Sequence, residues 1–229
     1  MTTTADPAVT LGVADIEALD AHELVGALVA RFGAGLVLAC SFQKEETVLL
    51  DMLFAADPGA RVFALDTHVL FDETYAYWQQ VEERYGTTVE VFDGPSIGKQ
   101  AAAEGPNLWE RDQNRCCAIR KTEPLGRALA GRDAWITGMR RDQSPTRANA
   151  PKFHWDEGHG LWKANPLADW SDDRCWEYIR ERDLPTNPLH DKGYASIGCI
   201  WCTMPGTGRE GRWSGTDKTE CGLHVPLEG

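Results

Sequence analysis

Cysteine is the residue type in this chain whose number and spacing most clearly indicate chemistry. Of seven cysteines, Cys116 and Cys117 are adjacent, and Cys199 and Cys202 form a CxxC pair. Together they offer four thiolates, the number that one tetrahedral zinc ion or one iron–sulfur cluster requires. The CxxC pair alone would also suit a zinc knuckle or a redox dithiol. Adjacent side chains normally diverge, and a helix start or kink is one way to bring both to one metal centre. A multi-iron cluster spreads its ligand positions more than a single zinc does, which modestly favours a cluster.

The other three cysteines stand alone. Cys40 falls in an apolar strand pattern and Cys175 in an amphipathic helix pattern, so we interpret both as small buried hydrophobic residues. Cys221 belongs to the stretch "KTECGLHVPLEG", with no second cysteine nearby. By itself it could be half of a disulfide, a metal ligand, a nucleophile or an idle side chain.

Cationic and imidazole groups surround Cys221 in the sequence. They are Arg209, Arg212, Lys218 and His224. Such neighbours lower the pKa of a thiol from about 8.5 toward about 3.5–7.5 and so favour the reactive thiolate. Cys221 is therefore a candidate nucleophile, with an idle surface cysteine as the alternative.

Two groups of arginines favour an anionic substrate. "TGMRRDQSPTR" contains Arg140, Arg141 and Arg147, and "GREGRW" contains Arg209 and Arg212. An arginine fork donates two charge-assisted hydrogen bonds to phosphate or sulfate oxygens. The alternative for either group is a solvated loop with structural ion pairs. Two such groups beside a candidate nucleophile make the anionic substrate the better interpretation.

Alternating patterns predict the elements that must position these residues. Apolar runs predict strands at 35–42, 61–67, 87–93 and 134–139. Helical spacing predicts helices at 13–32, 43–57, 72–86, 116–131 and 171–183, the last with Ser171 as N-cap. Strands alternating with helices predict an α/β fold with a mostly parallel, twisted sheet flanked by helices.

Ligands of such sheets bind at the carboxyl ends of the strands. The candidate ends are "CSFQKEE", "LDTHVLF" and "TGMRRDQS". The first of these has neither a GxxxxGK[ST] nor a GxGxxG pattern, and its two glutamates, Glu45 and Glu46, would repel a triphosphate. Hydrolysis of Mg-ATP is therefore disfavoured.

The length of 229 residues predicts one domain with appendages. We expect a flexible arm at 1–12, a single α/β nucleotide-binding domain with the cysteine site at 13–202, and a mobile catalytic tail at 203–229. After Leu184 the periodicity gives way to Gly, Pro and Trp, which predicts irregular structure. A long irregular segment in a compact chain is more often functional than idle.

Composition excludes several classes of protein. The formal charge is −12, from 35 acidic and 23 basic residues, which disfavours nucleic-acid binding. No apolar run reaches the about 18–20 residues needed to cross a bilayer, and the start of the sequence lacks a secretory pattern. We therefore expect a cytoplasmic protein with reduced cysteines.

The motifs "CCAIRK", "TGMRRDQSPTRA", "GCIWCT", "GREGRW" and "ECGLH" occur in this order. In this order they resemble the assimilatory adenylyl-sulfate reductases, the iron–sulfur branch of the phosphoadenylyl-sulfate reductase family. The resemblance covers the chain from about residue 30 onward and implies an adenine-nucleotide α-hydrolase-like fold. It departs from the family at Gln43–Glu46, where many members carry a Ser-Gly-Ala-type turn.

The resemblance implies a role for each matching residue. Cys221 would be the nucleophile, and Cys116, Cys117, Cys199 and Cys202 would hold a [4Fe–4S] cluster. The substrate would be bound by two groups of residues. Lys121, Arg147, Arg209, Arg212 and His224 would face the phosphosulfate, whereas Ser41, Phe42, Asp66, Phe71 and Gly138 would face the adenosine.

The implied reaction is the thiol-dependent reduction of adenylyl sulfate to sulfite and AMP, through an S-sulfocysteine on Cys221, with thioredoxin or a similar thiol donor. A reductase of the 3′-phosphorylated nucleotide, or of both, is the closest alternative. Alternatives from other classes are an ATP-dependent thiolation or ligase-type enzyme and a zinc-stapled nucleotide-binding module. The sequence leaves homo-oligomer formation open.

Overall fold

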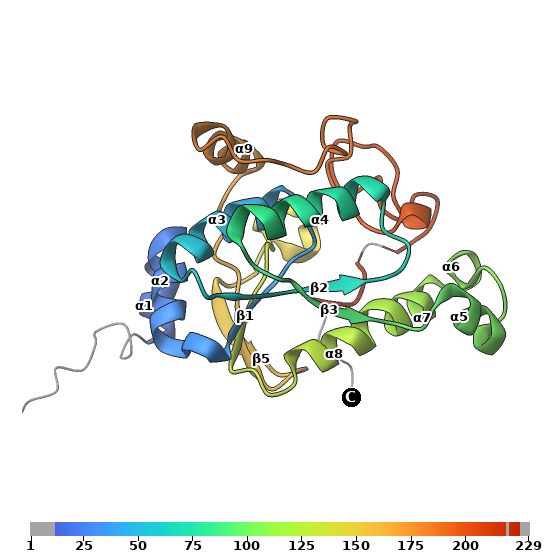
Figure 1. Cartoon of the computed structure of the whole chain (residues 1–229), viewed down its shortest axis with the longest axis horizontal. Coiled ribbons are helices and arrows are strands. Elements are labelled where there is room, and N and C mark those ends of the chain that lie inside the picture. Colours follow the sequence, from blue (N-terminus) through green and yellow to red (C-terminus); the bar gives the residue numbers. More distant parts are fainter. Residues whose placement is uncertain (1–11, 219, 225–229) are drawn as a thin grey trace, which may run out of the picture. The chain divides into compact units, whose positions relative to one another are not determined.

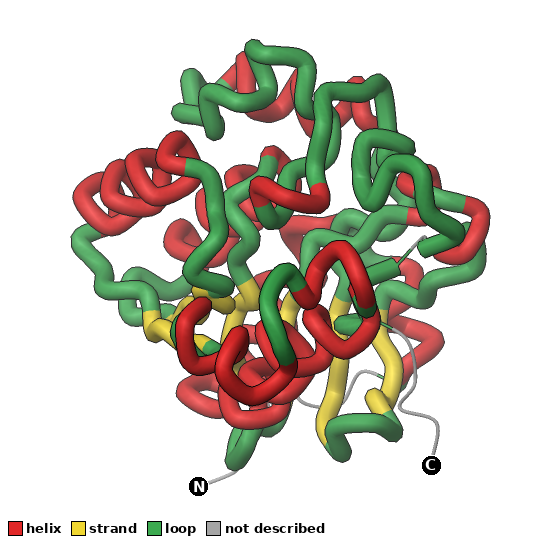
Figure 2. The backbone as a smooth tube through the Cα atoms, turned by 90° about the vertical axis from the view of Figure 1, so that its right-hand side faces the viewer, coloured by secondary structure: helices red, strands yellow, loops and turns green. Residues whose placement is uncertain are grey.

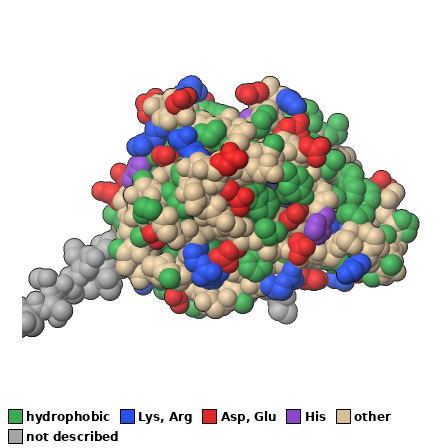
Figure 3. All heavy atoms as spheres, in the orientation of Figure 1, with side chains coloured by type: hydrophobic (Ala, Val, Ile, Leu, Met, Phe, Trp, Pro, Cys, Tyr) green, Lys and Arg blue, Asp and Glu red, His purple; other side chains and the backbone are tan. Residues whose placement is uncertain are grey.

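The computed structural model of the chain describes residues 12–218 and 220–224. Most of the predicted arm, residues 1–11, and the end of the tail, residues 225–229, lie outside the described residues. None of the described helices is long and apolar enough to cross a membrane. On the face drawn in Figure 3, acidic and basic side chains are interspersed rather than segregated.

Within the described residues, six strands form one sheet in the order β3-β2-β1-β4-β6-β5. The strands are β1 (Leu36–Ala39), β2 (Arg61–Asp66), β3 (Glu90–Asp93), β4 (Ala134–Ile136), β5 (Phe153–Asp156) and β6 (Leu161–Ala164). β1 with β4, β4 with β6 and β2 with β3 are parallel, whereas β5 and β6 are antiparallel. The predicted fold class is therefore confirmed.

The β5–β6 hairpin was not predicted. Each strand has only four residues, and the two are joined by the turn after Asp156. β5 lies at the end of the strand order and leaves Trp155 43% exposed. β5 has the sequence Phe-His-Trp-Asp and lacks the apolar run by which the four predicted strands were recognised.

The helices refine the predicted ranges, and Figure 1 labels them. They are α1 (Val13–Ala18), α2 (Ala21–Phe32), α3 (Lys44–Ala56), α4 (Asp72–Tyr85), α5 (Ile97–Glu104), α6 (Leu108–Arg111), α7 (Gln113–Cys117), α8 (Glu123–Leu129) and α9 (Asp172–Glu181). Ser171 caps α9 as predicted, because its hydroxyl accepts from the Arg174 backbone at 3.2 Å.

Two predicted helices are each interrupted. The range 13–32 is two helices, because Asp20 and Glu23 form a capping box that starts α2 afresh. The range 116–131 contains a π-helical turn, Ala118–Thr122, between α7 and α8. π-turns inside helices are rare and are frequent at functional sites. The helical segments at 97–111 were not predicted.

The chain divides into two compact units. The first consists of Met1–Ala39, Lys44–Val62 and Gly131–Pro185. In it α3 contacts both α2 and α9, and β4 lies between β1 and β6. Its core includes Leu24, Leu49 and Trp135, each no more than 1% exposed. Complete burial of such a side chain contributes about 1.5–3 kcal/mol.

The second unit consists of Cys40–Gln43, Phe63–Ala130 and Thr186–Gly229. After α9 the described residues, up to 218 and 220–224, form loops and the 3₁₀ turn Ile200–Cys202, as predicted for the region after Leu184 (Figure 1, orange to red). Figure 2 shows that long stretches of the backbone are loops and turns, drawn in green. Asn187, fully buried, anchors this irregular chain by donating to the Phe42 carbonyl at 3.2 Å and to the Thr74 hydroxyl at 3.1 Å.

Candidate active site

The four paired cysteines all lie in the second unit. Cys116 and Cys117 end α7 where the π-turn begins, which is the kind of helix irregularity that could direct both side chains to one metal centre. Cys199 and Cys202 bracket the 3₁₀ turn, and the Cys202 backbone donates to the Cys199 carbonyl at 3.0 Å. All of these thiols are buried except that of Cys202, which is half-buried.

These thiols are electrostatic neighbours. Burial raises the pKa of Cys202 to about 11, and Cys199, Cys117 and Cys116 contribute in the same direction. Burial also raises the pKa of Cys117, against the opposing influence of Lys121. Segments more than 80 residues apart in the sequence therefore bring four thiols within range of one another.

Cys221 packs against this group of cysteines. It forms a buried cluster with Cys117 and Trp213, against which Cys202 and Leu223 pack. Burial by itself would raise the pKa of Cys221. Lys121, a hydrogen bond from the Leu223 backbone and Arg212 outweigh burial, so the pKa of Cys221 is lowered. Among the seven cysteines, Cys40 and Cys175 are buried, 5% and 0% exposed, as expected for core residues.

Lys121 is a buried cation four residues after Cys117 in the sequence. The π-turn carries it, and it is 9% exposed. Burial alone would lower its pKa, but Cys199, Cys221 and Cys117 raise it above the ordinary value. Within residues 12–218 and 220–224 no carboxylate forms an ion pair with Lys121. The ammonium group therefore faces thiols and is charged at neutral pH.

Arg212 is held by neutral partners. Its Nη1 donates to the Ile197 carbonyl at 3.0 Å and to the Ser196 hydroxyl at 3.3 Å, and its guanidinium lies 4.6 Å from the Trp213 ring centroid. A Cβ atom at position 198 would overlap this guanidinium, so Gly198 is required for its placement. No carboxylate in the described part of the chain pairs with Arg212.

Arg209 differs from Arg212 in its partner. Its Nη2 lies 3.0 Å from Oε2 of Glu220, the residue before Cys221, and both side chains are 16% exposed. Arg209 and Lys218 lie 5.9 and 5.6 Å from the Trp213 ring centroid, so three cations surround this one indole. His224 is half-buried, three residues after Cys221.

Four residues predicted to face the adenosine also lie in the second unit. Phe42 has a left-handed backbone, φ 59°, and stacks on Trp78 with centroids 4.8 Å apart. Ser41 accepts from Gln43 Nε2 at 3.0 Å, and Gln43 Oε1 accepts from the Ile197 backbone at 2.6 Å. The turn that departs from the family pattern is thus tied to the loop that holds Arg212.

Asp66 and Phe71 lie at and after the carboxyl end of β2. Asp66 accepts from the Tyr75 hydroxyl at 2.7 Å and from the His68 backbone at 2.7 Å. Phe71 makes an edge-on contact with Tyr194, with ring centroids 5.4 Å apart. Asp66 is thus already hydrogen-bonded at the strand end where the sequence predicted a ligand.

Gly138 and Arg147 belong to the first unit. Gly138 has no room for a side chain, because a Cβ atom would overlap Glu45 and Glu46. Arg147 is 7% exposed and donates to Gln143 Oε1 at 2.5 Å.

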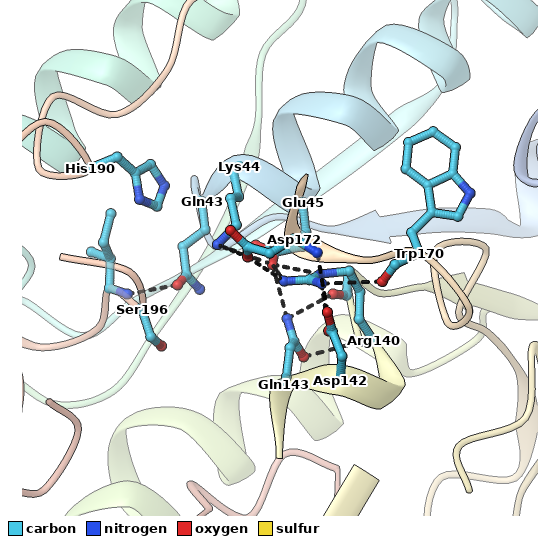
Figure 4. A network of polar contacts seen from close by, with 12 residues as sticks. Gln43, Lys44, Glu45, Arg140, Asp142, Gln143, Trp170, Asp172, His190 and Ser196 are labelled. Carbon is cyan, nitrogen blue, oxygen red and sulfur yellow. Dashed lines mark hydrogen bonds and ion pairs between the residues drawn. The ribbon is translucent and has the colours of Figure 1, made fainter. Parts of the chain in front are cut away.

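A network of ion pairs around the buried side chains of Lys44, Glu45 and Arg140 lies at the start of α3 (Figure 4). Arg140 binds Glu45 at 2.9 Å and Asp172 at 2.7 Å, and Lys44 binds Asp172 at 3.0 Å. Arg141 pairs with Glu17. Arg140 and Arg141 therefore form structural ion pairs, which is the alternative that the sequence left open for the first arginine group. The negative charge of Glu45 is compensated by these cations, whereas the sequence suggested that it would repel a triphosphate.

Comparison with known proteins settles the family. Residues 35–205 match the phosphoadenosine phosphosulfate reductase domain. An adenosine 5′-phosphosulfate reductase of Salinibacter ruber is 47% identical over 86% of this chain and 81% of its own. A phosphoadenosine 5′-phosphosulfate reductase of Gloeobacter violaceus is also 47% identical, over 91% of this chain and 90% of its own. This chain belongs to the phosphoadenosine phosphosulfate reductase family.

Solved structures agree with this assignment. The phosphoadenylyl-sulfate reductase of Candida auris, in complex with phosphate, superposes with a TM-score of 0.74 at 28% identity, covering 86% of this chain and 99% of that chain. The FMN adenylyltransferase of Candida glabrata, at 14% identity and a TM-score of 0.59, shares the fold. The chain is thus a reductase with an adenine-nucleotide α-hydrolase-like fold.

Several residues around the candidate site were not identified from the sequence. Trp213, Gly198 and Gln43 act through contacts with Arg212 and Ile197, and only the motif "GREGRW" pointed near one of them. Arg120 was missed as well. It is 1% exposed and donates through Nη1 to the Thr67 carbonyl at 2.7 Å. Its position three residues after Cys117 could have indicated from the sequence that it lies near the cysteines.

The residues present fit a sulfur-ligated cluster. The donor set is four thiols, and buried N–H donors around it lack an acceptor within the described residues: Arg120 Nε and Nη2, Arg212 Nε and Trp213 Nε1. A buried donor without an acceptor costs about 1–3 kcal/mol, so an acceptor-rich anionic group would satisfy these donors. The described residues hold no group of three or more His, Cys, Asp or Glu that would bind a single metal ion.

Proposed function

We propose that this reductase converts adenylyl sulfate to sulfite and AMP, using a thiol donor, in sulfate assimilation. The observation that carries the proposal is the position of Cys221. This thiol packs against Cys117 and Trp213, and the cations Lys121 and Arg212 lower its pKa. Relatives named adenosine 5′-phosphosulfate reductase, 43–47% identical over most of the chain, support this substrate.

In the first step, the Cys221 thiolate attacks the sulfur atom of the sulfuryl group. The bond between this sulfur and the phosphate oxygen breaks, and AMP leaves with the bonding electron pair. Cys221 then carries an S-sulfonate. Because a thiolate and a phosphosulfate repel each other, the cations of the site lower the barrier most in a dry environment.

In the second step, a thiolate of the donor attacks Cys221 Sγ and releases sulfite. The resulting mixed disulfide is resolved by the donor's second thiol, which frees Cys221 and leaves an oxidised donor. Both electrons come from the donor's thiols. A thioredoxin-type protein in a reducing cytoplasm would supply such a dithiol.

Cys116, Cys117, Cys199 and Cys202 would hold a [4Fe–4S] cluster. When bound, this cluster would fix the two cysteine segments and contribute to the electrostatic field around Lys121. We propose Lys121, Arg147, Arg209, Arg212 and His224 as the residues that bind the phosphosulfate. Ser41, Phe42, Asp66, Phe71 and Gly138 would contact the adenosine.

Mass spectrometry after mixing with adenylyl sulfate, in the absence of thiol, tests this proposal. We expect an added SO₃ group on the Cys221 peptide and none in Cys221→Ser. A label on Cys199 or Cys202 would show that the roles of the cysteines are misassigned. A protein with bound zinc and no absorbance near about 400 nm would exclude the cluster.

Reduction of the 3′-phosphorylated nucleotide is the second candidate. The relative from Gloeobacter violaceus and the Candida auris structure both carry names for that activity. Measurement of kcat/KM for both nucleotides decides between the two, and a clear preference for the 3′-phosphate would overturn our assignment.

A further inference from the structure

Glu220 forms an ion pair with Arg209, one of the cations that would bind the substrate in the proposed function. Its Oε2 lies 3.0 Å from Arg209 Nη2, and both side chains are largely shielded from solvent. Glu220 directly precedes the candidate nucleophile Cys221 in the chain. An anion bound at Arg209 would therefore compete with a group that is covalently linked to the reacting residue.

Arg209 differs in this respect from the other cations of the site. Arg212 donates to the neutral Ser196 hydroxyl and Ile197 carbonyl, and Lys121 faces thiols. In the part of the chain that the structure describes, neither of them pairs with a carboxylate. Arg209 alone among these three cations carries an internal anion.

The chain just before Glu220 is anchored to α7. The Thr216 hydroxyl donates to Gln113 Oε1 at 3.2 Å, and Lys218 donates to Asn114 Oδ1. Gly222, with φ 87°, follows Cys221 and allows a turn there that other residues rarely adopt. The Arg209–Glu220 pair is thus a polar tie on the short segment that carries the nucleophile, beyond the anchor to α7.

We propose that Glu220 is an internal competitor of the substrate: its carboxylate occupies Arg209 in the ligand-free enzyme, and the phosphosulfate displaces it. This inference rests on the proposed function and extends it to the regulation of the same site. A carboxylate and a sulfate or phosphate oxygen use the same guanidinium N–H groups, so both cannot be bound there at once. Displacement of Glu220 couples arrival of the anion to the position of Cys221.

Equilibrium binding of adenylyl sulfate tests the competition. Titration calorimetry in a Cys221→Ser background prevents turnover and compares Glu220→Gln with its parent. We expect Kd to fall about threefold to tenfold, because a partly buried ion pair no longer has to be broken. Glu210→Gln is the matched control, since Glu210 is a carboxylate of the same loop that binds Thr207 and Gly208 instead of Arg209. Its Kd should match that of the parent.

A double-mutant cycle separates competition from a structural role. In an Arg209→Gln background, Glu220→Gln should leave Kd unchanged, because the competition acts through Arg209. A Kd that is unchanged or raised by Glu220→Gln in the parent background overturns the proposal. If Glu220→Gln fails to fold, Glu220→Asp, whose shorter side chain weakens the pair, should lower Kd in the same direction.

Failure of this inference is distinct from failure of the proposed function. The mass of the Cys221 peptide reports whether the chemistry occurs, and it does not depend on Glu220. An SO₃ adduct with an unchanged Kd in Glu220→Gln would overturn the inference alone. Absence of the adduct in the unaltered enzyme would overturn the proposed function.

Discussion

Two buried groups of cations, one in each unit, have opposite environments. In the first unit, Arg140 and Lys44 are neutralised by Glu45 and Asp172. In the second, Lys121 and Arg212 face thiols, an indole and neutral oxygens. Cations whose charge is balanced inside the protein stabilise it, whereas cations without an internal anion are available to a ligand. The comparison separates structural arginines from those suited to bind substrate.

The largest expected effect is on the stability of the first unit. Arg140→Met removes the guanidinium that pairs with buried Glu45 at 2.9 Å, which should cost about 3–5 kcal/mol of unfolding free energy. Chemical denaturation measures this loss. Arg141→Met is the matched control, because its side chain is 35% exposed, so its ion pair with Glu17 should contribute about 1 kcal/mol or less. Equal losses in both variants would contradict the comparison.

Removal of a cation from the second unit should affect activity instead. Lys121→Met should lower kcat/KM for adenylyl sulfate about 10²–10³-fold, because charge that develops near Cys221 loses its stabilising partner. The midpoint of thermal unfolding should change little, since no carboxylate is left unpaired. Lys99→Met, an exposed lysine of α5, serves as the control and should keep full activity. A Lys121→Met variant that is active but unstable would show that this cation stabilises the fold and does not act on the substrate.

Acid should weaken the first group through Glu45. Burial opposes ionisation of this carboxyl, but Lys44 and Arg140 outweigh it and lower its pKa. Because the folded-state pKa lies below the unfolded value of about 4.3, its contribution to stability is complete above that pH and is lost as pH falls through the folded pKa. Unfolding measured from neutral pH down to about pH 3 should show this loss, and Glu45→Gln should flatten the dependence. Glu83→Gln, at an exposed position of α4, should retain it.

The smallest effect should come from crowding Arg212. Gly198→Ala would push the guanidinium aside, and KM for adenylyl sulfate should rise about threefold to tenfold, a change of about 1 kcal/mol in binding. Gly126→Ala in α8 is the control, because a Cβ atom there meets nothing within 4 Å. An unchanged KM in Gly198→Ala would show that the position of Arg212 is less constrained than its contacts indicate.

The sequence predicted the features that depend on local patterns. Strands β1 to β4, helices α3, α4 and α9 with its Ser171 cap, and the irregular segment after Leu184 all follow from spacing and composition. The sorting of the cysteines placed Cys40 and Cys175 in the core, and both are buried.

The features that the sequence could not predict depend on contacts between distant residues. Arg140 and Arg212 have the same charge and each belongs to a motif with a second arginine, but a partner of Arg140, Glu45, is 95 positions away. The roles of Gly198 and Gln43 likewise exist only through the folded loop around Ile197. No local pattern contains such information, which is why the two cation groups looked alike before the fold was known.

Release of AMP in a single turnover without thiol tests the central claim, that the second group of cations holds an anionic substrate against Cys221. Rapid quenching with quantification of AMP and of the modified peptide gives both products of the first step. The account predicts one equivalent of AMP for each S-sulfonated Cys221 and a strongly slowed reaction in Lys121→Met. AMP released without modification of Cys221, or an equal rate in Lys121→Met, would contradict it.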